Sequence, residues 1–183
     1  MKQALRNFRS FIHKGELQRA CIEYMVNNLL TQRQMYKHRK IFFMINEEST
    51  GDLSRKELIH MFWSQGFTDM TEYEMDRVLS LVDSDNSGQV SFDEFLMTCI
   101  DPKEMLIKEN LERAFKDFDE DNGGSVSPTE IIKALTPKSG GIPIDTWEKV
   151  FNVKPGQLSR KVQEITYNEF KLFMERIFGD EAL

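Results

Sequence analysis

The residues best suited to chemistry lie in one twelve-residue stretch, residues 83–94. Its oxygen donors, in order, are Asp83, Asp85, Ser87, the carbonyl of Gln89 and Glu94, and Ser91 can hold a water. Gly88 stands at the sixth position, where the backbone must turn at an angle that only glycine adopts cheaply. A shell of carboxylate, hydroxyl and carbonyl oxygens at this spacing is what Ca²⁺ prefers, so the stretch is predicted to be a calcium loop.

Apolar residues at helical spacing flank the loop on both sides. They are Met75, Val78, Leu79 and Val82 before it, and Phe95, Leu96, Cys99 and Ile100 after it. A helix, a calcium loop and a second helix make an EF-hand. Val90, at the eighth loop position, is expected to pair with the equivalent residue of a partner loop.

The same pattern recurs with a period near 37 residues. The glycine of the sixth position recurs as Gly51, Gly88 and Gly124, and the glutamate of the twelfth as Glu57, Glu94, Glu130 and Glu169. Such a period indicates four EF-hands. Hands fold in pairs because one hand cannot bury its apolar face alone. We therefore predict an all-α fold of two calmodulin-like lobes, divided near Asp101 and Pro102.

The other three loops depart from the full ligand set. Hand one, residues 46–57, offers Asn46, Glu48, Thr50, Asp52 and Glu57, but Asn46 removes a charge and Glu48 is one methylene too long. Calcium binding by hand one is left open. Hand three, residues 119–130, offers Asp119, Asp121, Ser125 and Glu130, and Gly123 at its fifth position has no side-chain oxygen. We expect hand three to bind calcium more weakly than hand two.

Hand four keeps the shape of a hand without its chemistry. Its early loop positions are occupied by Leu158, Arg160, Val162 and Gln163, none of which is a carboxylate or a glycine. Ile165 and Glu169 still match Val90 and Glu94. We interpret it as a structural hand that pairs with hand three.

Residues 1–39 precede the hands and form a basic amphipathic helical segment. Its candidate docking residues are Leu5, Phe8, Ile12, Leu17, Cys21, Tyr24, Met25 and Leu29. The first three share one helical face, and the five after Gly15 form a second apolar stripe at helical spacing. The pattern leaves open whether residues 1–39 are one long helix or two helices broken near Gly15. A helix of this kind beside calcium hands is typical of a calmodulin target, and a helix packed permanently on the body is the alternative.

Composition and charge exclude several classes of function. Residues 1–40 carry nine Lys or Arg against two acids, whereas the rest of the chain carries 15 against 28. The body is acidic and lacks stacked aromatics, which argues against nucleic-acid binding. Two isolated cysteines indicate neither a disulfide framework nor a zinc site, and no membrane span is apparent. A cytoplasmic location is expected, with membrane association through an unseen N-terminus left open.

The whole pattern resembles the C-terminal regulatory region of calcium-dependent protein kinases of plants and protists. Residues 4–9 (ALRNFR) look like the start of that family's junction segment, and residues 17–20 and 29–31 look like its continuation into the first hand. Residues 111–115 and 145–147 look like the beginnings of its third and fourth hands. The resemblance implies a junction helix over residues 1–39, a first lobe over 40–102 and a second over 103–183.

What the resemblance implies about function is a calcium sensor that relieves autoinhibition of a Ser/Thr kinase. The partners would be the chain's own N-terminal helix and its own kinase domain, and the kinase domain is absent from this sequence. No phosphate-binding glycine loop or catalytic loop of a kinase is present, so this chain alone is not expected to be an enzyme. The alternative is a free-standing sensor, like calmodulin, centrin or the calcineurin regulatory subunit, acting on a partner in trans.

Overall fold

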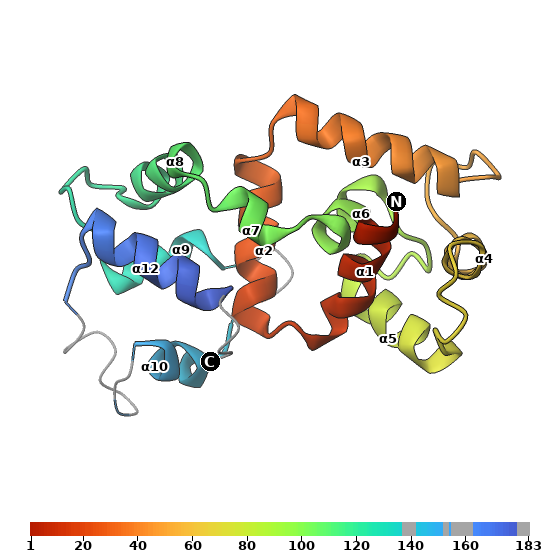
Figure 1. Ribbon diagram of the computed structural model, residues 1–183. Helices are drawn as coiled ribbons and strands as arrows, with labels where there is room; N and C mark the ends of the chain where they lie inside the picture. Colours follow the sequence, from red (N-terminus) through yellow and green to blue (C-terminus); the bar gives the residue numbers. More distant parts are fainter. Residues whose placement is uncertain (137–141, 152–153, 155–162, 179–183) are drawn as a thin grey trace. The chain divides into compact units, whose positions relative to one another are not determined.

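The computed structural model describes residues 1–136, 142–151, 154 and 163–178, and they form two compact units (Figure 1). Unit 1 contains residues 1–14 and 30–101, and unit 2 contains residues 15–29 and 102–183. The described part of the chain is helical and has no named strand, as the all-α prediction requires. None of its helices is long and apolar enough to cross a membrane.

Unit 1 is an EF-hand pair with an N-terminal helix on it. Its elements are α1 (Lys2–Ser10), the 3₁₀ turn η1 (Phe11–His13), α3 (Gln32–Ile45), α4 (Arg55–Ser64), α5 (Glu72–Val82) and α6 (Phe92–Cys99). The two loops pair through Leu53 and Val90, whose main chains exchange hydrogen bonds of 2.8 and 2.9 Å. The predicted pairing of Val90 with the equivalent residue of hand one is confirmed.

Local sequence determines where these helices begin. Helices α3, α4, α5 and α6 follow Thr31, Ser54, Thr71 and Ser91, and each cap has a Gln or Glu three residues later. The hydroxyl accepts the third amide of the helix, and the Gln or Glu side chain accepts the amide of the cap. In α4 and α6 that glutamate is also the twelfth residue of a calcium loop, so one side chain serves both structures.

The core of unit 1 is built on phenylalanines. Phe8, Phe62 and Phe95 are fully buried, and the Phe8 ring lies 5.7 Å from Phe62 and 6.5 Å from Phe95 between centroids. Phe42 of α3 packs edge-on against Phe95 at 5.5 Å. Helix α1 is therefore part of this core, since its Phe8 stands between the second helices of both hands.

Unit 2 repeats this plan with a second N-terminal helix. Its described elements are α2 (Glu16–Asn28), α7 (Pro102–Met105), α8 (Lys108–Phe118), α9 (Pro128–Ala134), α10 (Ile144–Val150) and α12 (Tyr167–Ile177). Val126 and Ile165 exchange two main-chain hydrogen bonds of 2.8 Å. This contact confirms that hand four pairs with hand three. Phe118 and Phe170 pack edge-on in the core at 5.3 Å.

The N-terminal segment is not one helix. Helix α1 ends at Ser10, η1 closes it, and α2 begins at Glu16 after Gly15. Lys14 has extended backbone, with ψ of 132°, which ends helical geometry before Gly15. The two helices fall in different units. Residues 32–39, which we grouped with the junction, are the first half of α3. The assignment of residues 1–39 as one functional domain stays a prediction.

An ion-pair cluster fastens α1 within unit 1. The Arg9 guanidinium donates to Asp69 Oδ2 at 2.8 Å and to Glu74 Oε1 at 2.9 Å. The Thr71 amide and the Arg9 guanidinium together lower the pKa of Glu74 from its ordinary 4.5 to about 2. Because the folded pKa is the lower one, ionised Glu74 stabilises the fold above about pH 4.5, and this stabilisation is lost as the pH falls toward 2.

We expect Arg9→Gln to destabilise unit 1 by roughly 0.5–1 kcal/mol at pH 7, because the pairs are partly exposed. The difference from wild type should shrink as the pH falls from about 4.5 toward 2, since protonated Glu74 no longer interacts with the guanidinium. Urea unfolding at several pH values measures both effects. Arg33→Gln, on α3, is the matched control and should change little. A difference independent of pH would contradict the assignment.

Candidate functional site

The loop between α5 and α6 gathers the carboxylates of hand two. Ligand oxygens of Asp83, Asp85 and Glu94 all lie within 4.8 Å of one another. Helix α5 ends at Val82, so Asp83 is the first residue free of helical geometry. Among the described residues, three or more metal-ligating side chains gather this closely in residues 83–94 and in residues 119–130.

The amides of the loop hold the first aspartate in place. Asp83 Oδ1 accepts the Ser87 amide at 2.9 Å, and Asp83 Oδ2 accepts the Gly88 amide at 2.8 Å. Gly88 has a φ of +79°, in the left-handed region. A side chain there would strain the turn that aims these amides, as the sequence indicated. The Ser87 amide also donates to Asp85 Oδ1 at 3.0 Å, so the two aspartates share one donor.

Glu94 joins the two ends of this loop. Its Oε1 accepts from the amide and hydroxyl of Ser84, both at 2.8 Å. Its Oε2 accepts from the amide of Ser91 at 3.0 Å and from the hydroxyl at 2.9 Å. The side chain is only 5% exposed. A buried carboxylate that faces two aspartates is a strong anionic centre for a divalent cation.

Loop 119–130 reproduces this geometry with one defect. Asp119 accepts the amides of Gly123 and Gly124 at 2.8 and 2.9 Å. Glu130 accepts from the Ser127 amide and hydroxyl at 2.8 and 2.7 Å, and these bonds, with a further one from the Glu120 amide, lower its pKa. The fifth position, Gly123, supplies only its amide.

Hand four contributes a side chain that the sequence reading did not assign. The Ser125 hydroxyl, at the seventh position of loop three, donates to Glu164 Oε2 at 2.5 Å. Glu164 directly precedes Ile165, the residue that bridges to Val126. In this antiparallel bridge Ser125 lies opposite Thr166, so Glu164 reaches Ser125 diagonally, a contact that the sequence pattern does not indicate. Leu158, Arg160 and Val162 lie outside the described residues.

Loop 46–57 has the backbone of a calcium loop with a weaker anionic centre. Asn46 is buried and its Oδ1 accepts the Thr50 amide at 3.2 Å. Glu57 accepts from the amides of Glu48 and Ser54 at 3.1 and 2.8 Å. The Thr50 hydroxyl donates to the Asp52 carbonyl at 2.8 Å. Glu48 is exposed, and no group of three carboxylates forms among these described residues.

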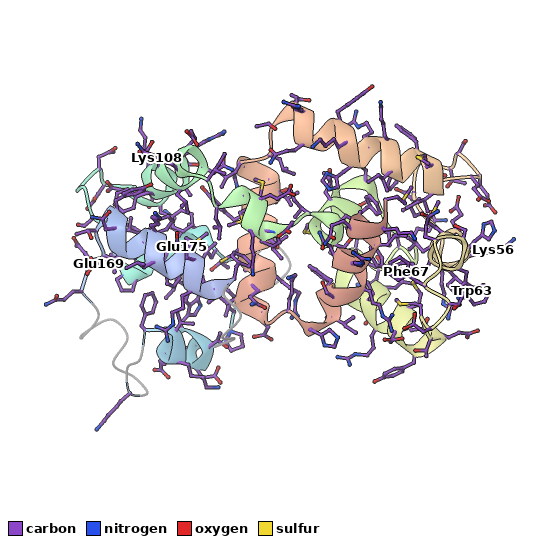
Figure 2. All side chains as sticks on the ribbon, viewed as in Figure 1. Lys56, Trp63, Phe67, Lys108, Glu169 and Glu175 are labelled. Atoms are coloured by element: carbon purple, nitrogen blue, oxygen red, sulfur yellow. The ribbon has the colours of Figure 1, made fainter. Side chains whose placement is uncertain are left out.

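Glu169 of hand four shows the role that a loop glutamate keeps when it belongs to no close group of three or more described metal-ligating side chains. It lies at the start of α12 (Figure 2), and its Oε2 accepts from the Thr166 amide and hydroxyl, both at 2.8 Å. These bonds lower its pKa. Glu169 therefore retains the capping function of Glu94, but among the described residues it does not belong to a cluster of metal-ligating side chains.

Most of the predicted docking residues are buried. Leu5, Phe8, Leu17, Cys21, Met25 and Leu29 are at most 5% exposed, while Ile12 and Tyr24 are partly exposed. Phe11, which the sequence places beside the face of Leu5 and Phe8, is also buried, and the pattern missed four further buried residues, namely Ala4, Ala20, Ile22 and Val26. Ile22 and Val26 are four residues apart and widen the stripe of α2, a spacing that was visible in the sequence.

The donor sets of the loops agree with the family model that matches the chain. Residues 35–97 match the EF-hand domain pair. EF-hand domains bind Ca²⁺ through oxygen ligands of the kind gathered here.

Curated relatives extend the match to most of the chain. Calcium-dependent protein kinase 4 of Plasmodium berghei is 32% identical over 160 residues, which cover 82% of this chain and 30% of the relative. The Plasmodium falciparum protein of the same name is 33% identical over 143 residues, which cover 73% of this chain and 27% of the relative. Calcium-dependent protein kinase 17 of Arabidopsis thaliana is 25% identical over 152 residues, which cover 83% of this chain and 28% of the relative.

This chain is thus a calcium-binding EF-hand protein whose homologues are calcium-dependent protein kinases, and it spans about 30% of their length. A crystal structure of a C-terminal domain covers 95% of the chain at 22% identity, with a TM-score of 0.41.

We expect Gly123→Ser to raise the calcium affinity of hand three roughly three- to tenfold, because it adds the missing oxygen at the fifth position. The φ of Gly123 is not positive, and its added Cβ would meet only the movable Asp121 carboxylate, at 2.8 Å from Oδ1. Gly123→Ala adds the same Cβ without the oxygen and is the matched control. Calorimetric titration measures the calcium affinity of both variants. Equal affinities for the Ser and Ala variants would contradict the claim that hand three lacks a ligand oxygen at its fifth position.

Proposed function

We propose that this chain is the calcium-sensing regulatory segment of a Ser/Thr protein kinase and acts in the cytoplasm. Its N-terminal segment restrains the kinase domain at low calcium, and the EF-hand units hold that segment when calcium binds. The likeness to calcium-dependent protein kinases over most of the chain supports this proposal. Support from the structure comes from the way each unit buries one N-terminal helix.

The loop geometry supports a specific set of calcium ligands. Hand two would use Asp83, Asp85, Ser87, Gln89 and Glu94, and hand three would use Asp119, Asp121, Ser125 and Glu130. Hand one would use Asn46, Glu48, Thr50, Asp52 and Glu57, with fewer charges. Bound calcium supplies positive charge that neutralises these clustered carboxylates.

In unit 1, the helix that carries Glu94 also contacts α1. One residue beyond Glu94, Phe95 packs against Phe8, and the Asn7 side chain donates to the Cys99 carbonyl at 2.9 Å. Helix α6 thus begins in the calcium loop and ends against the N-terminal helix. If calcium binding changes the position of Glu94, α6 would move with it, and the surface of α6 that contacts α1 would move as well.

In unit 2, the residues just before the loop contact α2. Phe118, which directly precedes Asp119, packs edge-on against the Tyr24 ring at 4.8 Å. The Tyr24 hydroxyl donates to Asp117 Oδ2 at 3.0 Å. The far end of the unit also holds α2, because the Gln18 side chain donates to the Ile177 carbonyl at 2.8 Å. Both loops are therefore within two residues of a side chain that touches an N-terminal helix.

The charges of the chain favour binding of the N-terminal segment by the EF-hand units. The first 40 residues have a net charge of +7 and the remainder has −13. Opposite charge promotes encounter between the segment and the hands. Moving a two-state switch from 1:99 to 99:1 takes about 5.5 kcal/mol of differential binding. Two calcium sites that each prefer the state with the N-terminal segment bound by roughly 3 kcal/mol, or three that each prefer it by roughly 2 kcal/mol, meet that requirement.

A free-standing sensor acting in trans is the second candidate. It would present an apolar face to a separate target. Here Leu5 and Phe8 of α1 and Leu17 and Met25 of α2 already occupy apolar surface in their units. A target in trans would have to displace them, which disfavours this candidate.

We expect Glu94→Gln to abolish most of the calcium response and Glu169→Gln to change almost nothing. Both glutamates accept from the cap of their helix, and an amide oxygen keeps that role, but Glu94 alone also faces two aspartates. Calorimetric calcium titration of both variants measures the difference. A normal titration for Glu94→Gln would remove hand two as the principal site.

The kinase part of the proposal is tested on the polypeptide that naturally contains this chain. Its phosphotransfer to a generic Ser/Thr peptide should depend on calcium, and Glu94→Gln should remove that dependence while Glu169→Gln retains it. A polypeptide without kinase activity, whose calcium titration is nevertheless normal, would favour the sensor in trans.

A further inference from the structure

Helix α3 has an outward face that the calcium-sensing function does not use. Besides Gln32 at its start, seven of its side chains are exposed: Arg33, Tyr36, Lys37, Arg39, Lys40, Phe43 and Met44. Four are cations, and Tyr36, Phe43 and Met44 are 60–65% exposed large apolar groups. No acidic residue occurs in Gln32–Ile45. We call these seven residues the α3 face.

The fold does not require this face. The inner side of α3 is anchored by Phe42 and Ile45, which are 2% and 1% exposed. The Phe42 ring packs edge-on against Phe92 and Phe95 of α6 at 5.4 and 5.5 Å. Within the α3 face, Arg39 lies over Phe92 and the Phe43 ring packs edge-on against Phe42 at 6.1 Å. The other five side chains of the face take no part in these ring contacts, so their composition is free to serve another purpose.

The cations of the α3 face have no carboxylate partner among the described residues, whereas two arginines elsewhere in unit 1 do. Arg9 pairs with Asp69 and Glu74, and Arg55 pairs with Glu72 and Asp76. Within the described residues, no ion pair involves the four cations of α3. Two of them lie over aromatic rings instead, Lys40 Nζ at 4.6 Å from the Tyr36 centroid and Arg39 Cζ at 5.0 Å from Phe92. In a chain with 30 acids, four unpaired cations on one helix are available to an external anion.

We propose that the α3 face binds the surface of a bilayer containing anionic phospholipids. Its cations would meet lipid headgroups, and each contributes roughly a fivefold factor to partitioning. Tyr36, Phe43 and Met44 stand among the cations, where amphipathic and apolar side chains can enter the interfacial region. Phosphate contacts of nucleic acid would use the cations but leave Phe43 and Met44 in water, so a bilayer uses more of the face.

The proposal is independent of the kinase assignment, because it concerns the α3 face and not the binding of the N-terminal helices by the EF-hand units. Attraction must be short-ranged, since the whole chain has a net charge of −6. Binding should therefore weaken strongly between low salt and about 0.5 M salt, as screening shortens the reach of the four cations.

The test is sedimentation of the intact chain with vesicles of phosphatidylcholine alone and of phosphatidylcholine with 30% phosphatidylserine, in EDTA so that calcium cannot bridge protein and lipid. We expect binding to the mixed vesicles only. The quadruple variant R33Q, K37Q, R39Q, K40Q should bind at least fiftyfold more weakly. Phe43→Ser with Met44→Ser should weaken binding roughly tenfold and preserve the dependence on salt.

The matched control neutralises four cations that are ion-paired in unit 2, K108Q, K133Q, K149Q and K171Q. It makes the same change in net charge and should bind as wild type does. Unchanged circular dichroism and thermal midpoints establish that the variants fold. Equal losses in both quadruple variants, or no binding by wild type, would overturn the proposal. So would equally tight α3-dependent binding to polyglutamate or single-stranded RNA, which would assign the face to an acidic protein or to nucleic acid.

Discussion

The double role of the glutamate that closes each loop is the constraint on which the rest of the structure depends. Glu94 accepts from Ser91 to start α6 and from Ser84 at the other side of the loop, and it faces Asp83 and Asp85. The same side chain is therefore a helix cap and a member of the anionic centre. Because α6 also carries Phe95 and Cys99, which contact Phe8 and Asn7 of α1, one helix touches both the calcium loop and the N-terminal helix.

Comparison of the loops separates the requirements of fold from those of ion binding. Glu57, Glu94, Glu130 and Glu169 all cap a helix, and the bridges Leu53–Val90 and Val126–Ile165 join the loops in pairs. These features are independent of which loop holds carboxylates. The carboxylates gather closely in the second and third loops. A hand can thus lose its ligands and still support its partner, as Glu164 does for Ser125.

Much of this could be predicted from the sequence because loop chemistry is local. The spacing of Asp83, Gly88 and Glu94 determines the turn, the cap and the donors within twelve residues. The break between α1 and α2 could not be assigned, since the apolar stripes before and after Gly15 satisfy either a continuous or an interrupted helix. Division of the N-terminal segment between two units is a matter of packing, and it depends on side chains such as Phe62 and Phe118 that are distant in sequence. The contact of Glu164 with Ser125 could not be predicted either, because it runs diagonally across the Val126–Ile165 bridge between residues far apart in the sequence.

Calcium-dependent holding of α1 and α2 is the central claim, and hydrogen exchange of their amides in the intact chain tests it most directly. The account predicts that amides in Lys2–Ser10 and Glu16–Asn28 exchange at least tenfold more slowly with saturating calcium than with EDTA. It also predicts that this difference disappears when Glu94 and Glu130 are both replaced by glutamine. Equal protection of both helices with and without calcium would show that they are packed permanently on the body, and it would contradict the account.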